Sequence, residues 1–113
     1  MKLLSIENAE HYVWGDACDG WHLLKRSDVS VIQERVPPGK TETRHLHQHA
    51  RQFFYILEGE ASIAFEDEAI VVKRHQGVEV LPGVAHQFQN NSLSDVVFLV
   101  ISVPPSQGDR KDL

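Results

Sequence analysis

The chain contains very little cysteine. Of its 113 residues only Cys18 is a cysteine, which excludes an internal disulfide and a zinc site built from several thiolates. A lone cysteine is typical of proteins kept in a reducing compartment. We therefore expect a cytoplasmic protein whose fold is held together by packing and hydrogen bonds.

Long apolar runs and an excess of basic charge are missing as well. No segment approaches the roughly 20 apolar residues that span a membrane, and the apolar start of the chain is too short for the core of a signal peptide. The net charge is −5, and the 11 basic residues are scattered, whereas a nucleic-acid binder presents a basic stripe. We expect neither a membrane nor a nucleic acid as a partner.

Helical periodicity is also absent, apart from one turn that residues 5–12 could form. Short segments of β-branched and aromatic residues, separated by glycine and proline, take its place. This pattern predicts an all-β sandwich or barrel in one domain over residues 1–113, with an N-terminal arm over 1–20 and a loose polar tail over 104–113 that could also lie across a neighbour. The predicted strand segments are 29–36, 52–59, a hairpin over 60–74 that turns at 66–68, 77–83, 86–90 and 95–103.

Histidines are concentrated in one place. Three of the seven in the chain stand at alternate positions, His45, His47 and His49. Residues two apart in a strand point to the same face, so His45 and His47 could share one cation. Imidazole is a good ligand for zinc, copper, nickel and iron, although such pairs also occur on solvent-exposed faces.

Two spaced motifs surround these histidines. The first runs Gly39, His45, His47, Gln52, Gly59, and the second places His86 three residues after Gly83, with Asn90 four residues further on. Together they resemble the two motifs of the cupin superfamily. Glutamine replaces the usual glutamate at position 52. In the second motif His75 and Leu81 stand where the family has glycine and proline, with Gly77 and Pro82 close by.

The resemblance implies a jelly-roll barrel, or double-stranded β-helix, with a metal near its mouth. His45, His47 and His86 would be ligands of one divalent ion (Zn, Mn, Fe, Ni or Cu), and Gln52 would stand where the carboxylate ligand normally does. A neutral amide oxygen is a weaker donor than a carboxylate, so we expect looser metal binding and a stronger pull on anionic ligands. Alternatively, Gln52 bonds a water or the substrate. His49 is expected first at the rim and only second as a ligand.

Other side chains could complete such a site. Glu34 is a candidate for acid–base catalysis if it faces the cavity, but the sequence leaves the inner face of its strand open between the sets 30, 32, 34 and 31, 33, 35. Glu34 and Glu42 are candidate hydrogen-bond partners of the metal histidines. Phe54 and Phe88 are expected to line the pocket.

The sequence leaves the activity open. We expect a small metal-binding cupin that binds or transforms a small polar or anionic metabolite, as an isomerase or a dioxygenase for example. The alternatives are a non-catalytic sensor and a metal-free barrel, and whether the protein is an enzyme stays undecided. A homodimer is expected because a small barrel must cover its edge strands; the N-terminal strand or residues 98–103 could pair across subunits.

Overall fold

The structure is a computed structural model that describes all 113 residues. It contains eleven strands and no helix, as predicted. The strands are β1 (Glu10–Trp14), β2 (Cys18–Lys25), β3 (Ser30–Val36), β4 (His45–His47), β5 (Arg51–Glu58), β6 (Glu60–Ala64), β7 (Ala69–Lys73), β8 (Gly77–Val80), β9 (Gln87–Gln89), β10 (Val96–Val103) and β11 (Arg110–Asp112).

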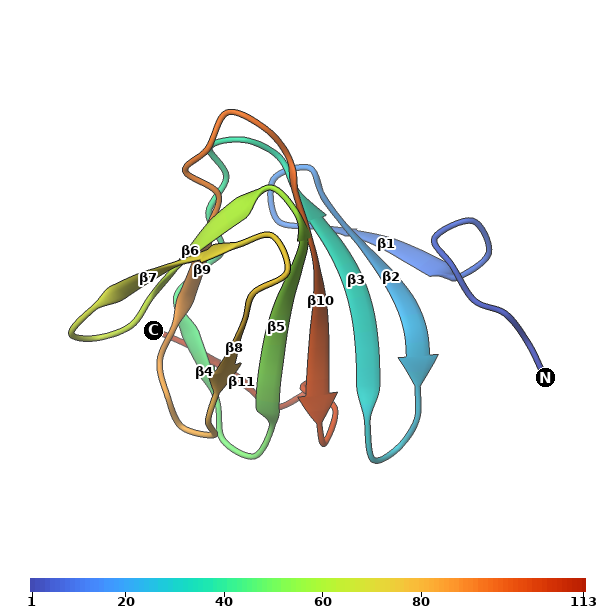
Figure 1. Cartoon of the computed structure of the whole chain (residues 1–113). Helices are drawn as coiled ribbons and strands as arrows, with labels where there is room; N and C mark the ends of the chain where they lie inside the picture. The colour runs from blue at the N-terminus through green and yellow to red at the C-terminus, as the bar shows by residue number, and fades with distance from the viewer.

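The strands form a jelly-roll barrel with two main layers (Figure 1). One layer is a six-stranded antiparallel sheet in the order β1-β2-β3-β10-β5-β8, and β7-β6-β9 form a three-stranded sheet. A short pair, β11-β4, completes the barrel. The predicted double-stranded β-helix is thus confirmed. The structure contains no helix of the length and apolarity that crossing a membrane requires.

The core lies between the layers and is made by alternate residues of the strands. Along β10 the buried apolar residues are Val96, Phe98 and Val100, which belong to one core cluster with buried residues of β5 and β6. Phe88 of β9 is 2% exposed and stacks on Phe98 with ring centroids 4.2 Å apart. This aromatic contact joins the second layer to the first.

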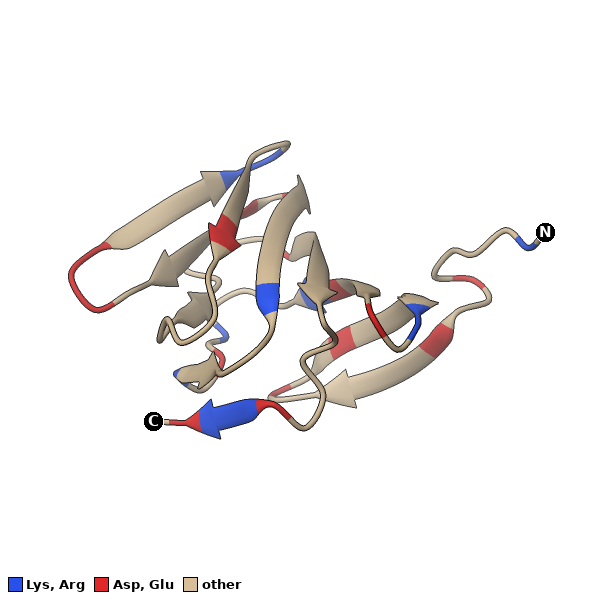
Figure 2. Ribbon diagram, turned by 90° about the horizontal axis from the view of Figure 1, so that it is seen from below, with Lys and Arg blue, Asp and Glu red and all other residues tan.

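The chain termini differ most from expectation. Residues 5–12 form no helix; β1 and β2 instead extend the large sheet beyond β3, so much of the expected arm belongs to the barrel. The tail is not loose either, because β11 pairs antiparallel with β4, with Arg110 opposite His47 and Asp112 opposite His45. Figure 2 shows this basic strand with acidic residues on both sides of it.

Strand β10 is wrong as a candidate for pairing across subunits. It lies inside the sheet between β3 and β5, and both of its edges are already hydrogen-bonded. Its continuous apolar sequence reflects this central position. The outer edge of β1 has no strand beside it. The N-terminal strand therefore still has a free edge for the pairing across subunits that the sequence also suggested.

Replacing Phe88 should test the aromatic contact between the layers. Phe88→Ala leaves a cavity in a packed core, and we expect a loss of about 3–5 kcal/mol in the free energy of unfolding. The matched control is Phe53→Ala, because Phe53 is 39% exposed, and it should lose under about 1 kcal/mol. Equal losses in urea denaturation would show that this contact does not hold the layers together.

Candidate metal centre

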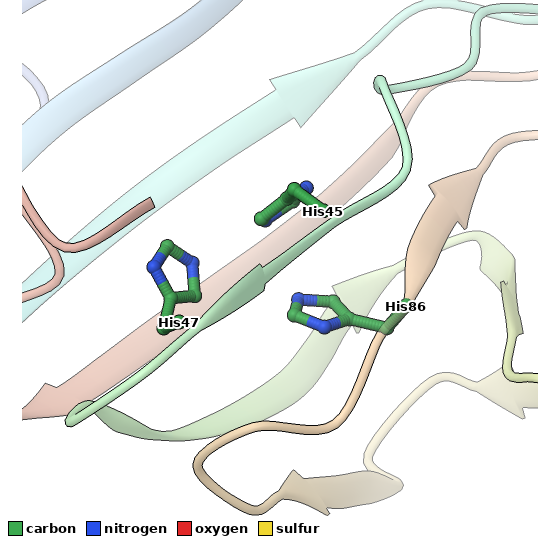
Figure 3. A group of neighbouring side chains, drawn as sticks. All are labelled: His45, His47 and His86. Carbon is green, nitrogen blue, oxygen red and sulfur yellow. The ribbon is translucent and has the colours of Figure 1, made fainter. Parts of the chain in front are cut away.

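Three histidines from two separate segments meet at one end of the barrel. His45 and His47 lie on β4, and His86 lies just before β9; all three are buried. Backbone N–H groups of His45 and His86 donate to each other's carbonyl oxygens at 3.0 and 2.9 Å. This pairing fixes the two segments side by side, and the potential ligand atoms of the three rings lie within 4.8 Å of one another. Figure 3 shows the rings around a common space.

Each histidine ring is oriented by a backbone carbonyl behind it. The acceptors are the carbonyl oxygens of Thr43, Asp109 and Val84, at 2.7, 3.0 and 2.9 Å from Nδ1 of His45, His47 and His86 respectively. A carbonyl can only accept, so each Nδ1 carries the proton and each Nε2 keeps its lone pair for a metal. The expected carboxylate partners are therefore replaced by backbone, although Glu42 lies 3.7 Å from Nδ1 of His45.

The protonation of the rings suits metal binding. Burial lowers the pKa of His45 to about 4, and burial likewise lowers the pKa values of His47 and His86. The three rings are consequently neutral at pH 7, the form in which imidazole binds metals. The Nε2 atom of His86 is buried and has no hydrogen-bond partner.

Gln52 presents an unpaired oxygen to the same space. It is buried on β5, and its Nε2 donates to Oγ of Ser102 at 3.1 Å. This leaves Oε1 buried without a partner, in the wall of the cavity that His45 and His47 also line. A buried polar atom without a partner is rare in folded proteins. The amide oxygen and the Nε2 lone pairs together fit a divalent ion.

A cavity of about 270 Å³ opens beside the histidines. Ile32 and Glu34 are both in its wall, so the inner face of β3 is the set 30, 32, 34. Phe54 is in the cavity wall as well; it lies opposite Val100 across the sheet, and its ring centroid is 6.0 Å from that of His86. Phe88 is in the core against Phe98, and it does not reach the cavity wall.

Glu34 is paired with a residue that the sequence did not point to. The hydroxyl of Tyr12 donates to Oε2 of Glu34 at 3.3 Å, and Gly20 on the strand between them leaves room for the Tyr12 ring. Burial, with a smaller contribution from Glu42, raises the pKa of Glu34 to about 8. Burial also raises the pKa of Glu42 to about 7. The cavity thus holds carboxyl groups that can carry protons near neutral pH.

The remaining histidines lie outside this centre. His49 is exposed, and its backbone N–H donates to the Asp109 carboxylate at 2.9 Å. His11 and His75 are exposed as well. Arg110 was not expected in the site, yet it lines the cavity because β11 folds back onto β4. No local pattern in the tail reveals this long-range pairing.

Comparison with known proteins identifies the family. Residues 32–102 match the model of the cupin domain. The match covers more than half of the chain, and it includes both histidine segments. The chain therefore belongs to the cupin family, as its two motifs suggested.

Its similarity to individual proteins is more distant. An uncharacterised protein, MJ1618 of Methanocaldococcus jannaschii, is 28% identical over 74% of this chain and 67% of its own length. The tetracenomycin polyketide synthase protein TcmJ of Streptomyces glaucescens is 26% identical over 62% of this chain, and the match spans about half, 48%, of that protein. The structure of the polyketide cyclase RemF from Streptomyces resistomycificus superposes with a TM-score of 0.86 at 15% identity, covering 100% of this chain and 85% of RemF.

The raised pKa of Glu34 should be visible in the stability of the metal-free protein. Between pH 4.5 and about 8 the folded state holds a proton on Glu34 that the unfolded state has lost, so stability falls as pH rises through this window. Glu34→Gln removes this effect. With a chelator present, its melting temperature should equal that of the parent at pH 5 and exceed it at pH 9 by about 5 °C or more.

A control separates this effect from the loss of one negative charge. Glu66→Gln changes a carboxylate in the exposed turn between β6 and β7 and should leave the difference between pH 5 and pH 9 unchanged. If Glu34→Gln behaves in the same way as Glu66→Gln, Glu34 is an ordinary solvated carboxylate and not a proton carrier of the cavity.

Proposed function

We propose that the protein binds one divalent metal ion and uses this site to move protons on a small molecule that carries carbonyl or hydroxyl groups. The ligands are Nε2 of His45, His47 and His86 and Oε1 of Gln52. The observation that carries the proposal is the orientation of the three rings. Each ring is fixed by a hydrogen bond from Nδ1 to a backbone carbonyl, so the lone pair of its Nε2 is free to bind a metal. The unpaired Oε1 of Gln52 supplies a fourth donor.

The ligand set favours acid–base chemistry over oxidation. All four donors are neutral, so a bound divalent ion would keep its full charge and act as a Lewis acid toward an oxygen of the substrate. Higher oxidation states gain from an anionic ligand, which this set lacks. Isomerisation or ring closure by proton transfer is therefore the better-supported reaction class, and a dioxygenase is the less favoured one.

Glu34 is our candidate for the proton carrier. It lies in the wall of the same cavity as the histidines, and the Tyr12 hydroxyl holds one of its oxygens. A pKa of about 8 would let the carboxyl group both accept and release a proton near neutral pH. RemF, which has a similar fold, is named as a polyketide cyclase, and ring closure is one of the reactions in this class.

We further infer a cytoplasmic homodimer. The single cysteine, Cys18, is buried and reduced, which suits a reducing compartment. The edge of β1 is unpaired in the single chain, and pairing with a second copy would cover it.

Metal content is the direct test of the site. The protein purified from cells should carry about one divalent ion per chain, and His47→Ala should lose it. Loss of a hydrogen-bond partner behind a ligating histidine typically costs about 10- to 100-fold in metal affinity, so loss of a ligand should cost more. His49→Ala is the matched control, because this histidine lies two residues away and is exposed. Elemental analysis that finds no metal in the parent, or equal metal in both variants, contradicts the proposal.

Gln52 offers a test of the fourth ligand. Gln52→Glu should tighten zinc binding, measured by competition with a chelator, since a carboxylate brings a negative charge to the ion. The metal-free form of this variant should melt at a lower temperature because the new charge is buried with only the neutral Ser102 hydroxyl to donate to it. Gln52→Ala should weaken zinc binding. Unchanged zinc affinity in both variants would mean that Gln52 bonds a water or the substrate instead.

A further inference from the structure

A second, larger chamber lies next to the metal cavity. Its volume is about 680 Å³, and residues of β1, β2 and β3 form its floor. Cross-strand partners in a sheet point to the same face, and one such row runs across both chambers. Along this row Glu10 is opposite His22, His22 opposite Ile32, Ile32 opposite Val100, and Val100 opposite Phe54.

The two chambers share part of their walls. Tyr12 and Ile32 line both of them from the sheet, and Ser106 and Gln107 line both from the segment before β11. The Tyr12–Glu34 hydrogen bond therefore lies where the chambers adjoin. A molecule with one end in the metal cavity can extend past Tyr12 into the larger chamber.

Most of the residues that line the larger chamber have polar or charged side chains. They carry the hydroxyl groups of Ser27, Ser30 and Ser106 and the amide of Gln107. His22 also lines this chamber. Such a set of donors and acceptors suits a molecule that carries several hydroxyl groups.

Two adjacent cations mark one side of this chamber. Lys25 and Arg26 at the end of β2 are both exposed and both line it. Glu10 is the single carboxylate in the lining, and it lies 3.4 Å from the ammonium of Lys25. The positive charge of Arg26 is therefore not balanced by a carboxylate of the lining. Its guanidinium has the planar geometry that binds a carboxylate or a phosphate with two hydrogen bonds.

We propose that the larger chamber holds the hydroxylated body and the acidic end of the substrate, with a carboxylate or phosphate beside Lys25 and Arg26 and the reacting oxygen directed to the histidines. This inference rests on the proposed function. The metal cavity alone, at about 270 Å³, is smaller than the roughly 300–1,000 Å³ of ordinary ligand pockets. The larger chamber, at about 680 Å³, supplies the missing space, so the substrate class is a polyhydroxylated organic acid of about the size of a sugar acid.

Three matched small molecules test whether the chamber binds the acidic end of the substrate. Glucose, glucuronate and glucose 6-phosphate share one ring and differ in charge, and each would be titrated into the zinc-loaded protein by calorimetry. We expect at least one of the two acids to bind about fivefold or more tightly than glucose, and the stronger of the two identifies carboxylate or phosphate as the preferred group. Lys25→Gln combined with Arg26→Gln should weaken binding of that acid by about five- to tenfold and leave glucose binding unchanged.

The chain provides a matched control for the double substitution. Lys73 and Arg74 are another adjacent and exposed pair, and they line neither chamber. Lys73→Gln combined with Arg74→Gln should leave the preference for the acid intact. Equal binding of all three probes, or equal weakening by the two double variants, overturns the proposal.

The same titrations separate this proposal from the metal site. If the acid binds equally well to His47→Ala and to the zinc-loaded parent, but loses affinity in the Lys25 and Arg26 variant, the chamber stands and the metal function fails. If the acid loses affinity in His47→Ala alone, the zinc site holds the acid group directly. In that case the chamber has no role in recognising the acid, and the inference is wrong.

Discussion

The site depends on the backbone pairing of His45 with His86. Two reciprocal N–H···O=C bonds join residues that are 41 positions apart in the sequence. Bonds from the Glu42 N–H to the Phe88 carbonyl and from the Gly83 N–H to the His47 carbonyl continue this pairing on either side. Once they are joined, backbone carbonyls bind Nδ1 of each ring and fix its direction. Backbone is a more rigid support than a side chain, because it has no rotamers of its own to lose. Three rings can thus be held ready for one ion by the fold itself.

The C-terminal tail is part of this support. The carbonyl of Asp109 accepts from His47, and its carboxylate accepts backbone N–H groups of residues 48, 49 and 50 at 3.0, 2.9 and 2.8 Å. These bonds hold the turn between β4 and β5, and hence the spacing from His47 to Gln52. The tail also brings Arg110 into the cavity wall. Residues far along the sequence therefore fix both the orientation of His47 and the charge around the three histidines.

The sequence predicted the strands and the histidines well and the termini poorly. Alternation and turn residues identified the segments of β3 and β5–β10. The two spaced motifs identified His45, His47 and His86. Both kinds of signal depend on local order or fixed spacing. The roles of β1, β2 and β11 depend on pairing between distant segments, which leaves no local pattern. Tyr12 and Arg110 were missed for this reason. Phe88 was expected at the cavity; it points into the barrel as His86 does, but its ring packs against Phe98 in the core.

Buried polar atoms without hydrogen-bond partners in the cavity lower the stability of the fold, and a function of the site would explain why they are there. Buried polar groups without partners, Oε1 of Gln52 and Nε2 of His86, each disfavour folding by about 1–3 kcal/mol. The raised pKa values of Glu34 and Glu42 also lower the stability of the folded state near pH 8. A barrel that served only as a scaffold would gain by filling this space with apolar side chains, as it does around Phe88 and Phe98. Departures from good packing cluster where the motifs meet, so the residues found there fit the proposed metal and ligand binding better than a role in folding alone.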